Sequence, residues 1–446
     1  MIDLSRDTAL GLALSCACLP VFAVFSAPPV NAQAVSALKS LEQSPHSPIP
    51  SQRYFSDIEE PEALPVRQRP RPDYNAGGLR YSSFLFFPNL MTTPFYDSNV
   101  YATSGNKQSD AGIIFASALV ANSDWNNHEL MFDVGMVHVQ YFDLQSETQT
   151  DGHAAVSGRV DVRRDLVVMA AVSAARHHEQ RGTSNSPMTA AEPVPYDEFD
   201  GSLSVTKSFN RVDVSLGAAA EHRNYHSVRS VSGGSLNQDY RDGNWFNVGG
   251  RVSYLMKPGI QIFGDLRYNW RRYDNASGLN SNSQGYNLFG GLEFTLTSLI
   301  RGEIGIGYMS QSYDGAGISD PSGLKYSANL IWNATPLITV TLKGERLINE
   351  AGIVGAGGRI DSDVSIALDY ELRRNVIVSP SVSILYEDYV GIPRSDFVAE
   401  PNLKVDYLIN RNFSVGAEYA YTIRDSSMSV NDFNRHYVGI NAQAQF

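Results

Sequence analysis

Five histidines are the residues of this chain best suited to chemistry: His153, His177, His178, His222 and His226. With the many serines and carboxylates around them, they would suit hydrolysis of a lipid or a glycan, or metal binding. However, the sequence holds no G-x-S-x-G, no H-E-x-x-H and no paired cysteines. The neighbours in "RHHE" would point to opposite faces of a strand, which favours a polar strand end. We expect no catalytic residue, no metal site and no cofactor.

A second set of residues could act on ions and polar solutes, because charged side chains recur at every second position. These candidate pore-lining residues are Arg251, Asp265, Arg267, Arg271, Lys343, Glu345, Asp361, Asp363, Asp369, Glu371, Glu387, Glu400, Lys404, Asp406, Glu418 and Arg424. Earlier segments add Arg159, Asp161, Arg163, Asp213, Glu221 and Arg223. One wall would be mostly acidic and the opposite wall more basic, a field that orients water and small polar solutes. Alternatively, opposite charges simply pair with one another, and both interpretations can hold together.

The elements that position these charges alternate with period two. In "NFSVGAEYAYTIR", Phe413, Val415 and Tyr419 share one face, while Glu418 and Arg424 share the other. Such a strand is half apolar and half polar. The apolar face often ends in tyrosine or tryptophan, as an interfacial girdle requires, and the polar face would line a lumen.

Short turns alternate with long polar connections along the chain. The long ones are Met91 to Asp110, His177 to Asp197, His226 to Asp242, Asp274 to Gln284, Tyr313 to Gly323 and Asn349 to Gly358. This pattern predicts an all-β fold, a transmembrane antiparallel meander β-barrel of about eighteen strands. The least regular strands are Glu129 to Phe142 and the one holding Pro380; without one of them the number would fall to about sixteen. The first two long connections are the candidate constrictions of the lumen.

The chain ends in "HYVGINAQAQF", which alternates Val438, Ile440, Ala442, Ala444 and Phe446 with polar residues. In a closed barrel the last strand pairs with the first. A terminal aromatic after alternating apolar residues resembles the signal read by the barrel assembly machinery. We therefore interpret these five residues as the barrel-closure signal.

Composition agrees with a barrel. The chain has 446 residues, 36 of them glycine, and only 18% are charged. Acidic residues outnumber basic ones by 47 to 35, which disfavours a nucleic-acid partner. Past the N-terminus, no apolar run is long enough for a membrane-spanning helix.

The N-terminus divides into two parts before the barrel. Residues 1–34 read as a secretory signal peptide cleaved after Ala32 or Ala34, with a helical anchor or a lipoprotein at Cys16 as alternatives. Residues 35–78 are rich in proline and polar residues, which predicts a disordered periplasmic arm. Its run "RQRPRP" reads as a solvated linker or as a docking site for an acidic partner. The barrel would occupy residues 79–446.

Aromatic residues near the loops allow two interpretations. Tyr273, Tyr286 and Tyr313, with Arg271 and Arg272, could stack on sugars along a glycan path. The same positions suit an outer aromatic girdle, which the pattern favours.

Three sequence stretches resemble a known family. "RPRPDYNAGGLRYSSFLFFPNL", "YDSNVYAT" and "SDWNNHEL", between Arg69 and Leu130, are similar to the opening of the putative β-barrel porin type 2 family of Gram-negative bacteria. The resemblance implies an outer-membrane barrel. Many members occur beside exopolysaccharide genes in alphaproteobacteria, and the family implies no catalytic residue.

These observations predict a non-enzymatic outer-membrane porin that passes small polar solutes or assists surface polysaccharide export. The alternatives are a non-conducting structural or adhesion barrel and, third, a barrel enzyme acting on lipid or glycan. The expected partners are outer-membrane lipid and lipopolysaccharide, the barrel assembly machinery and components of polysaccharide export, with no nucleic acid.

Overall fold

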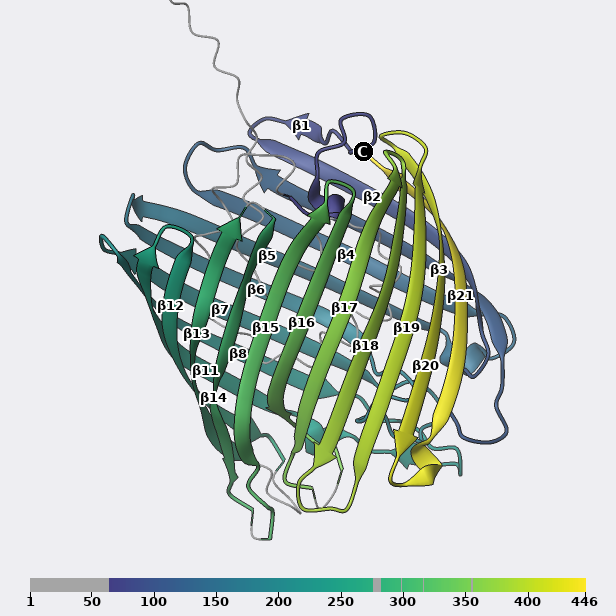
Figure 1. Ribbon diagram of the computed structural model, residues 1–446. Helices are drawn as coiled ribbons and strands as arrows, with labels where there is room; N and C mark the ends of the chain where they lie inside the picture. The colour runs from purple at the N-terminus through teal and green to yellow at the C-terminus, as the bar shows by residue number, and fades with distance from the viewer. Residues whose placement is uncertain (1–63, 276–281, 298, 316, 354–355) are drawn as a thin grey trace, which may run out of the picture.

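The computed structural model describes residues 64–446 apart from 276–281, 298, 316 and 354–355 (Figure 1). The proposed signal peptide (1–34) and most of the proposed arm lie outside the described residues. The strands are β1 (Leu79–Tyr81), β2 (Phe84–Asp97), β3 (Asp110–Ser123), β4 (Glu129–Tyr141), β5 (Gln149–Arg163), β6 (Leu166–His178), β7 (Pro195–Ser208), β8 (Val212–Tyr225), β9 (Val228–Arg229), β10 (Ser235–Leu236), β11 (Gly243–Lys257), β12 (Ile260–Tyr273), β13 (Ser283–Thr297), β14 (Ile300–Tyr313), β15 (Ser322–Thr335), β16 (Ile338–Asn349), β17 (Arg359–Arg373), β18 (Val376–Tyr389), β19 (Ser395–Leu408), β20 (Phe413–Ser426) and β21 (Phe433–Gln445).

Eighteen of these strands form one closed antiparallel barrel, which confirms the predicted fold and strand number. Each strand from β2 to β8 and from β11 to β21 pairs with its neighbours in the chain, and β2 pairs with β21 to close the ring. The two least regular predicted strands, β4 and the Pro380-containing β18, are both present. The strands are 12–15 residues long, enough to cross a bilayer at a tilt.

The outer face of the barrel is apolar. Exposed fractions of Leu216, Ile306 and Ile440 reach 61%, 64% and 61%, while the residues on either side of each point inward. A surface covered with such side chains is stable against lipid rather than water. Outward aromatics lie toward the strand ends, with Tyr254 and Trp332 near the short turns and Phe397 near the long loops. This face therefore has the apolar band and the aromatic girdles of a membrane barrel.

The connections at the two ends of the barrel differ in length. Two-residue turns join β5 to β6, β11 to β12, β15 to β16 and β17 to β18. We call this the short-turn end; Phe446 lies there, where its backbone N–H donates to Pro88. In bacterial barrels short turns face the periplasm and long loops face outward. Among the described residues, no helix is long and apolar enough to span a membrane.

Two predicted loop boundaries need correction. β2 continues to Asp97, so its loop covers residues 98–109 rather than starting at Met91. β6 ends at His178 and β7 starts at Pro195, so the second long loop covers residues 179–194. In both cases the strand extends because inward and outward residues keep alternating beyond the polar residues that suggested a loop.

The lipid-facing role of β21 can be tested at Ile440. The Ile440→Lys variant is expected to lower the free energy of unfolding by about 2–4 kcal/mol, because the charged lysine side chain would be placed in the hydrocarbon at the middle of the membrane. Urea-dependent folding into lipid vesicles measures this change. Ile440→Leu, which keeps an apolar side chain there, is the control and should stay within about 1.5 kcal/mol of the wild type. Equal stability of all three proteins would contradict the assignment.

Candidate functional site in the barrel lumen

All sixteen candidate pore-lining residues occupy inward positions of the barrel wall. Ten are buried: Arg251, Asp265, Arg271, Asp361, Glu371, Glu387, Lys404, Asp406, Glu418 and Arg424. The other six line one of two lumen cavities: Arg267, Lys343, Glu345, Asp363, Asp369 and Glu400. That these side chains meet a passing solute stays a prediction.

Many inward charges pair with one another. Arg424 lies 2.6 Å from Asp396 and 3.1 Å from Glu387, and Arg251 lies 2.7 Å from Glu303 and 3.3 Å from Glu293. Burial of single charges would be costly, so pairing between strands one to three apart in the ring is what allows them inside the barrel. The two interpretations of the inward charges, a pore lining and a set of ion pairs, are therefore compatible in this wall.

The larger cavity, of about 660 Å³, runs along the wall formed by β2–β5 and β16–β21. We call it the central cavity. It reaches from Asp369, near the short-turn end, to Asp97 at the long-loop end of β2. Its lining carries eight carboxylates and five cationic side chains, so it is acidic overall.

The second cavity, of about 490 Å³, lies at the long-loop end beside β8 and β11–β16. We call it the long-loop cavity. Six cationic side chains and three carboxylates line it, so its formal charge is opposite to that of the central cavity. Trp245, Tyr273 and Tyr313 border it on inward positions, and the indole N–H of Trp245 donates to Glu350 over 2.6 Å.

Residues 179–194, which we call the inward loop, cross the lumen. From between β6 and β7, the Ser184 hydroxyl reaches Glu387 of β18, nearly opposite in the ring, and accepts a hydrogen bond from Arg424 of β20 over 3.1 Å. Arg181 binds Glu147 through two hydrogen bonds of 2.7 and 2.8 Å, and the two side chains are 9% and 2% exposed. The loop therefore narrows the lumen, as the sequence predicted for this stretch.

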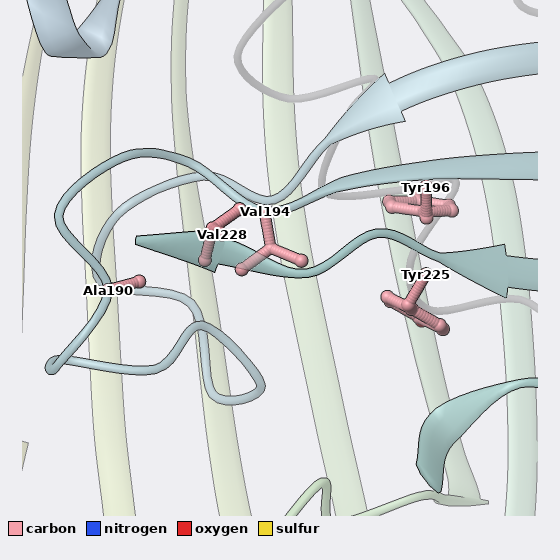
Figure 2. Close-up of a cluster of buried hydrophobic side chains, with 5 residues drawn as sticks. All are labelled: Ala190, Val194, Tyr196, Tyr225 and Val228. Atoms are coloured by element: carbon pink, nitrogen blue, oxygen red, sulfur yellow. The ribbon is translucent and has the colours of Figure 1, made fainter. Parts of the chain in front are cut away.

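A small apolar cluster anchors the base of the inward loop. Ala190 and Val194 of the loop pack with Val228 of β9 and with Tyr196 and Tyr225, at the ends of β7 and β8 (Figure 2). Val194 is fully buried, and the rings of Tyr196 and Tyr225 stack with centroids 5.1 Å apart. Apolar packing in an otherwise polar lumen fixes where the loop enters it.

Residues 64–78, which we call the inner segment, bind the inner wall at the short-turn end (Figure 1). The Arg67 guanidinium lies 2.7 Å from Asp369 and 2.8 Å from Asp406. Arg71 lies 2.7 Å from Glu371, with both side chains 3% exposed. Burial alone would lower the pKa of Arg67, but the Asp406 and Asp369 carboxylates outweigh it and raise that pKa.

The prediction for this stretch was wrong in part. "RQRPRP" is not a solvated linker, and residues 64–78 of the proposed disordered arm are ordered. Val66 is fully buried and donates its N–H to the Thr339 hydroxyl over 2.9 Å, within the 3₁₀ turn η2 (Val66–Gln68). Its arginines instead bind acidic side chains of the chain's own barrel wall. Arginine at every second position of this run was the sequence feature that indicated binding to acidic side chains.

The histidines do not converge on one site. The imidazole of His153 lies 3.2 Å from Asp133, and His178 lies 2.6 Å from Asp151. His177 packs on Tyr196, whereas His222 and His226 contact Asn244 and Asp197 elsewhere on the wall. Across the described part of the chain, no group of three or more histidine, cysteine or acidic side chains is placed to hold a metal ion.

The tyrosines predicted for the girdle divide between the two faces. Tyr286 is 43% exposed on the outer face, as expected for a girdle. Tyr273 and Tyr313 instead line the long-loop cavity. Period two explains this difference, because Tyr273 is two residues from the inward Arg271 and shares its face.

Comparison with known proteins decides the family. The family model described as putative beta-barrel porin 2 matches residues 71–446. The chain belongs to this family. The match starts inside the inner segment and includes all eighteen barrel strands. The chain is therefore a porin-like outer-membrane barrel, and its family supports a general role in transport.

Solved barrels give a weaker likeness. A structure described as the copper transporter OprC is 11% identical, with a TM-score of 0.46 and 82% of each chain covered. OprD of Pseudomonas aeruginosa is 11% identical, with a TM-score of 0.41, 83% of this chain and 99% of that chain covered. No curated protein matches the sequence. At these TM-scores, nothing about the function of this porin rests on those structures.

Proposed function

We propose that this porin passes small polar solutes passively, through the central cavity. The observation that carries the proposal is the extent of that cavity, which reaches from the inner segment to the inward loop within one barrel. An eighteen-stranded barrel is wide enough for an aqueous lumen. Its charged and polar lining can replace part of the hydration of a small solute.

Both ends of this path are narrowed by parts of the same chain. Arg67 of the inner segment and Arg181 of the inward loop line the central cavity near its two ends. The wild-type pore should therefore conduct weakly and open further when either contact is released. The same contacts support the second candidate, a non-conducting structural or adhesion barrel.

The family resemblance adds a broader proposal, assistance to surface polysaccharide export. The inner segment would then respond to an export component on the periplasmic side. Cells lacking this gene would export less polysaccharide, and re-expression of the wild-type chain would restore export. Unchanged polysaccharide in deletion cells would contradict this broader role.

Single-channel recording of the purified barrel in planar bilayers tests the main proposal. Small, stable, ohmic steps with a preference for cations are expected, because carboxylates predominate in the central cavity. The double variant Asp363→Asn, Glu400→Gln should reduce the cation-to-anion permeability ratio by about half. Asp388→Asn, which removes one carboxylate from the outer face, is the control.

If neither the wild type nor variants that free the inner segment or the inward loop conduct ions, conduction is contradicted and the structural barrel is favoured. Liposome swelling with neutral solutes of increasing size then gives the size limit of an open pore. An open pore with no response to Asp363 and Glu400 would place the path elsewhere in the lumen.

A further inference from the structure

The long-loop cavity contains a strip of uncharged amides on four successive strands. Asn247 of β11 lies directly opposite Asn269 of β12 in the sheet register. Asn287 of β13 and Gln311 of β14 continue the strip, and all four side chains line the cavity. They lie beneath Trp245, Tyr273 and Tyr313, whose rings border the cavity toward the loops.

Three of the four amides have unused hydrogen-bonding capacity, whereas Gln311 donates to the Ser283 hydroxyl over 2.9 Å. The structure shows no hydrogen bond from the side chain of Asn247 or Asn287 to any described residue, and both side chains are half-buried. The side-chain oxygen of Asn269 is buried and has no partner within the described chain. Buried polar groups are normally hydrogen-bonded, so an incomplete strip in a cavity indicates a ligand or ordered water.

Five of the six cationic side chains that line this cavity lie within 3.5 Å of a carboxylate, and the sixth, Arg271, lies 3.8 Å from Glu350. Arg223 lies 2.5 Å from Glu221, Arg359 lies 2.7 Å from Asp361, and Arg267 lies 2.8 Å from Asp265. Lys325 pairs with Glu345 over 3.5 Å, and Arg241 pairs with Glu179. An anionic ligand would have to break these pairs, whereas a neutral ligand would not.

We propose that the long-loop cavity is a binding site for a neutral saccharide of one or two rings. A hydroxyl group donates and accepts, and a carboxamide also does both, so the strip matches vicinal hydroxyls. The ring of Trp245 offers an apolar surface for the C–H face of a sugar, and its N–H is held by Glu350. The volume of about 490 Å³ falls in the usual range for small-molecule sites.

This inference rests on the proposed function in one respect, since a bound saccharide would have to continue through the lumen. Binding itself does not require conduction. The site can therefore be tested on the folded barrel in detergent micelles, by calorimetry and by tryptophan fluorescence, with Trp245 as the reporter inside the cavity. The probes are maltose, sucrose and glucuronate, which separate neutral rings from an anionic one.

Saturable binding of maltose or sucrose is expected, together with a change in Trp245 fluorescence that Trp245→Phe removes. The double variant Asn269→Ala, Asn287→Ala should weaken binding by about tenfold or more, because its hydrogen bonds are lost. Asn329→Ala is the matched control, since Asn329 is an inward amide on β15 that borders neither cavity.

Three outcomes would overturn the site. These are the absence of saturable binding of either neutral sugar to the folded wild type, equal binding by the double variant, and tenfold tighter binding of glucuronate. Unchanged resistance of each variant to unfolding in detergent confirms that the barrel is intact. Sugar binding without conductance would support the saccharide site and contradict the pore. Conductance without sugar binding would support the pore and contradict the saccharide site.

Discussion

The Arg67→Ala, Arg71→Ala variant is expected to raise the single-channel conductance by about twofold or more, because the path widens when the inner segment leaves the wall. Arg67 joins the segment to Asp369 and Asp406, and Arg71 joins it to Glu371. A buried carboxylate without its partner is unstable. When the segment leaves the wall, water reaches Glu371, and the free-energy cost of an unpaired buried carboxylate disappears. The double variant therefore favours the state in which the short-turn end of the lumen is open.

High salt should also favour release of the inner segment in the wild type. Arg67 is 21% exposed beside Asp369 and Asp406, so its pairs are partly screened at high ionic strength. The buried pair of Arg71 with Glu371 is screened less. Open probability should therefore rise with salt in the wild type and change little in the double variant, as measured by bilayer recording at several salt concentrations.

Arg80→Ala is the matched control for these variants. Arg80 pairs with Asp124 close to the same end of the barrel, but the two side chains are 57% and 40% exposed. Exposed pairs contribute little, so the conductance should match that of the wild type. If both the double variant and a barrel without residues 64–78 conduct like the wild type, the inner segment does not limit the path.

The second large effect is expected at the inward loop. In Arg181→Ala, the buried Glu147 loses both of its hydrogen bonds from the guanidinium. Removal of one partner of a buried pair costs up to about 3–5 kcal/mol, which here opposes docking of the loop. The loop should leave the lumen, and both the conductance and the current noise should rise.

Limited proteolysis provides an independent measure of loop release. Cleavage within residues 179–194 should become about tenfold faster in Arg181→Ala, because the local opening equilibrium shifts. The control is Arg229→Ala, which breaks the pair between Arg229 and Glu192 of the same loop, where Arg229 is 72% exposed. Unchanged cleavage in Arg181→Ala would show that the Glu147 pair does not hold the loop.

Membrane topology was predictable because it follows from local pattern. Each strand shows its own period of two, so the apolar outer face and the inward charges could be assigned without any long-range contact. Alternating short and long connections gave the order of the strands, and the final strand indicated closure. Even the inward position of Tyr273 follows from that of Arg271 by the same rule.

Contacts across the lumen could not be predicted from the sequence. Arg67 and Asp369 are 302 residues apart, and Ser184 and Glu387 are 203 apart. Such pairs depend on the curvature of the closed ring and on the path of each loop, which no local period encodes. For the same reason, the sequence left "RQRPRP" as either a linker or a docking segment.

The sequence by itself determined that this chain forms an eighteen-stranded outer-membrane barrel, because strand period, length and turn chemistry are local properties. Only the tertiary structure decided what the lumen contains. It placed Arg67 and Arg71 on the acidic wall and brought Arg181 to Glu147. The physical reason is that closure of the barrel brings residues from distant strands to one interior, where burial makes their pairing decisive.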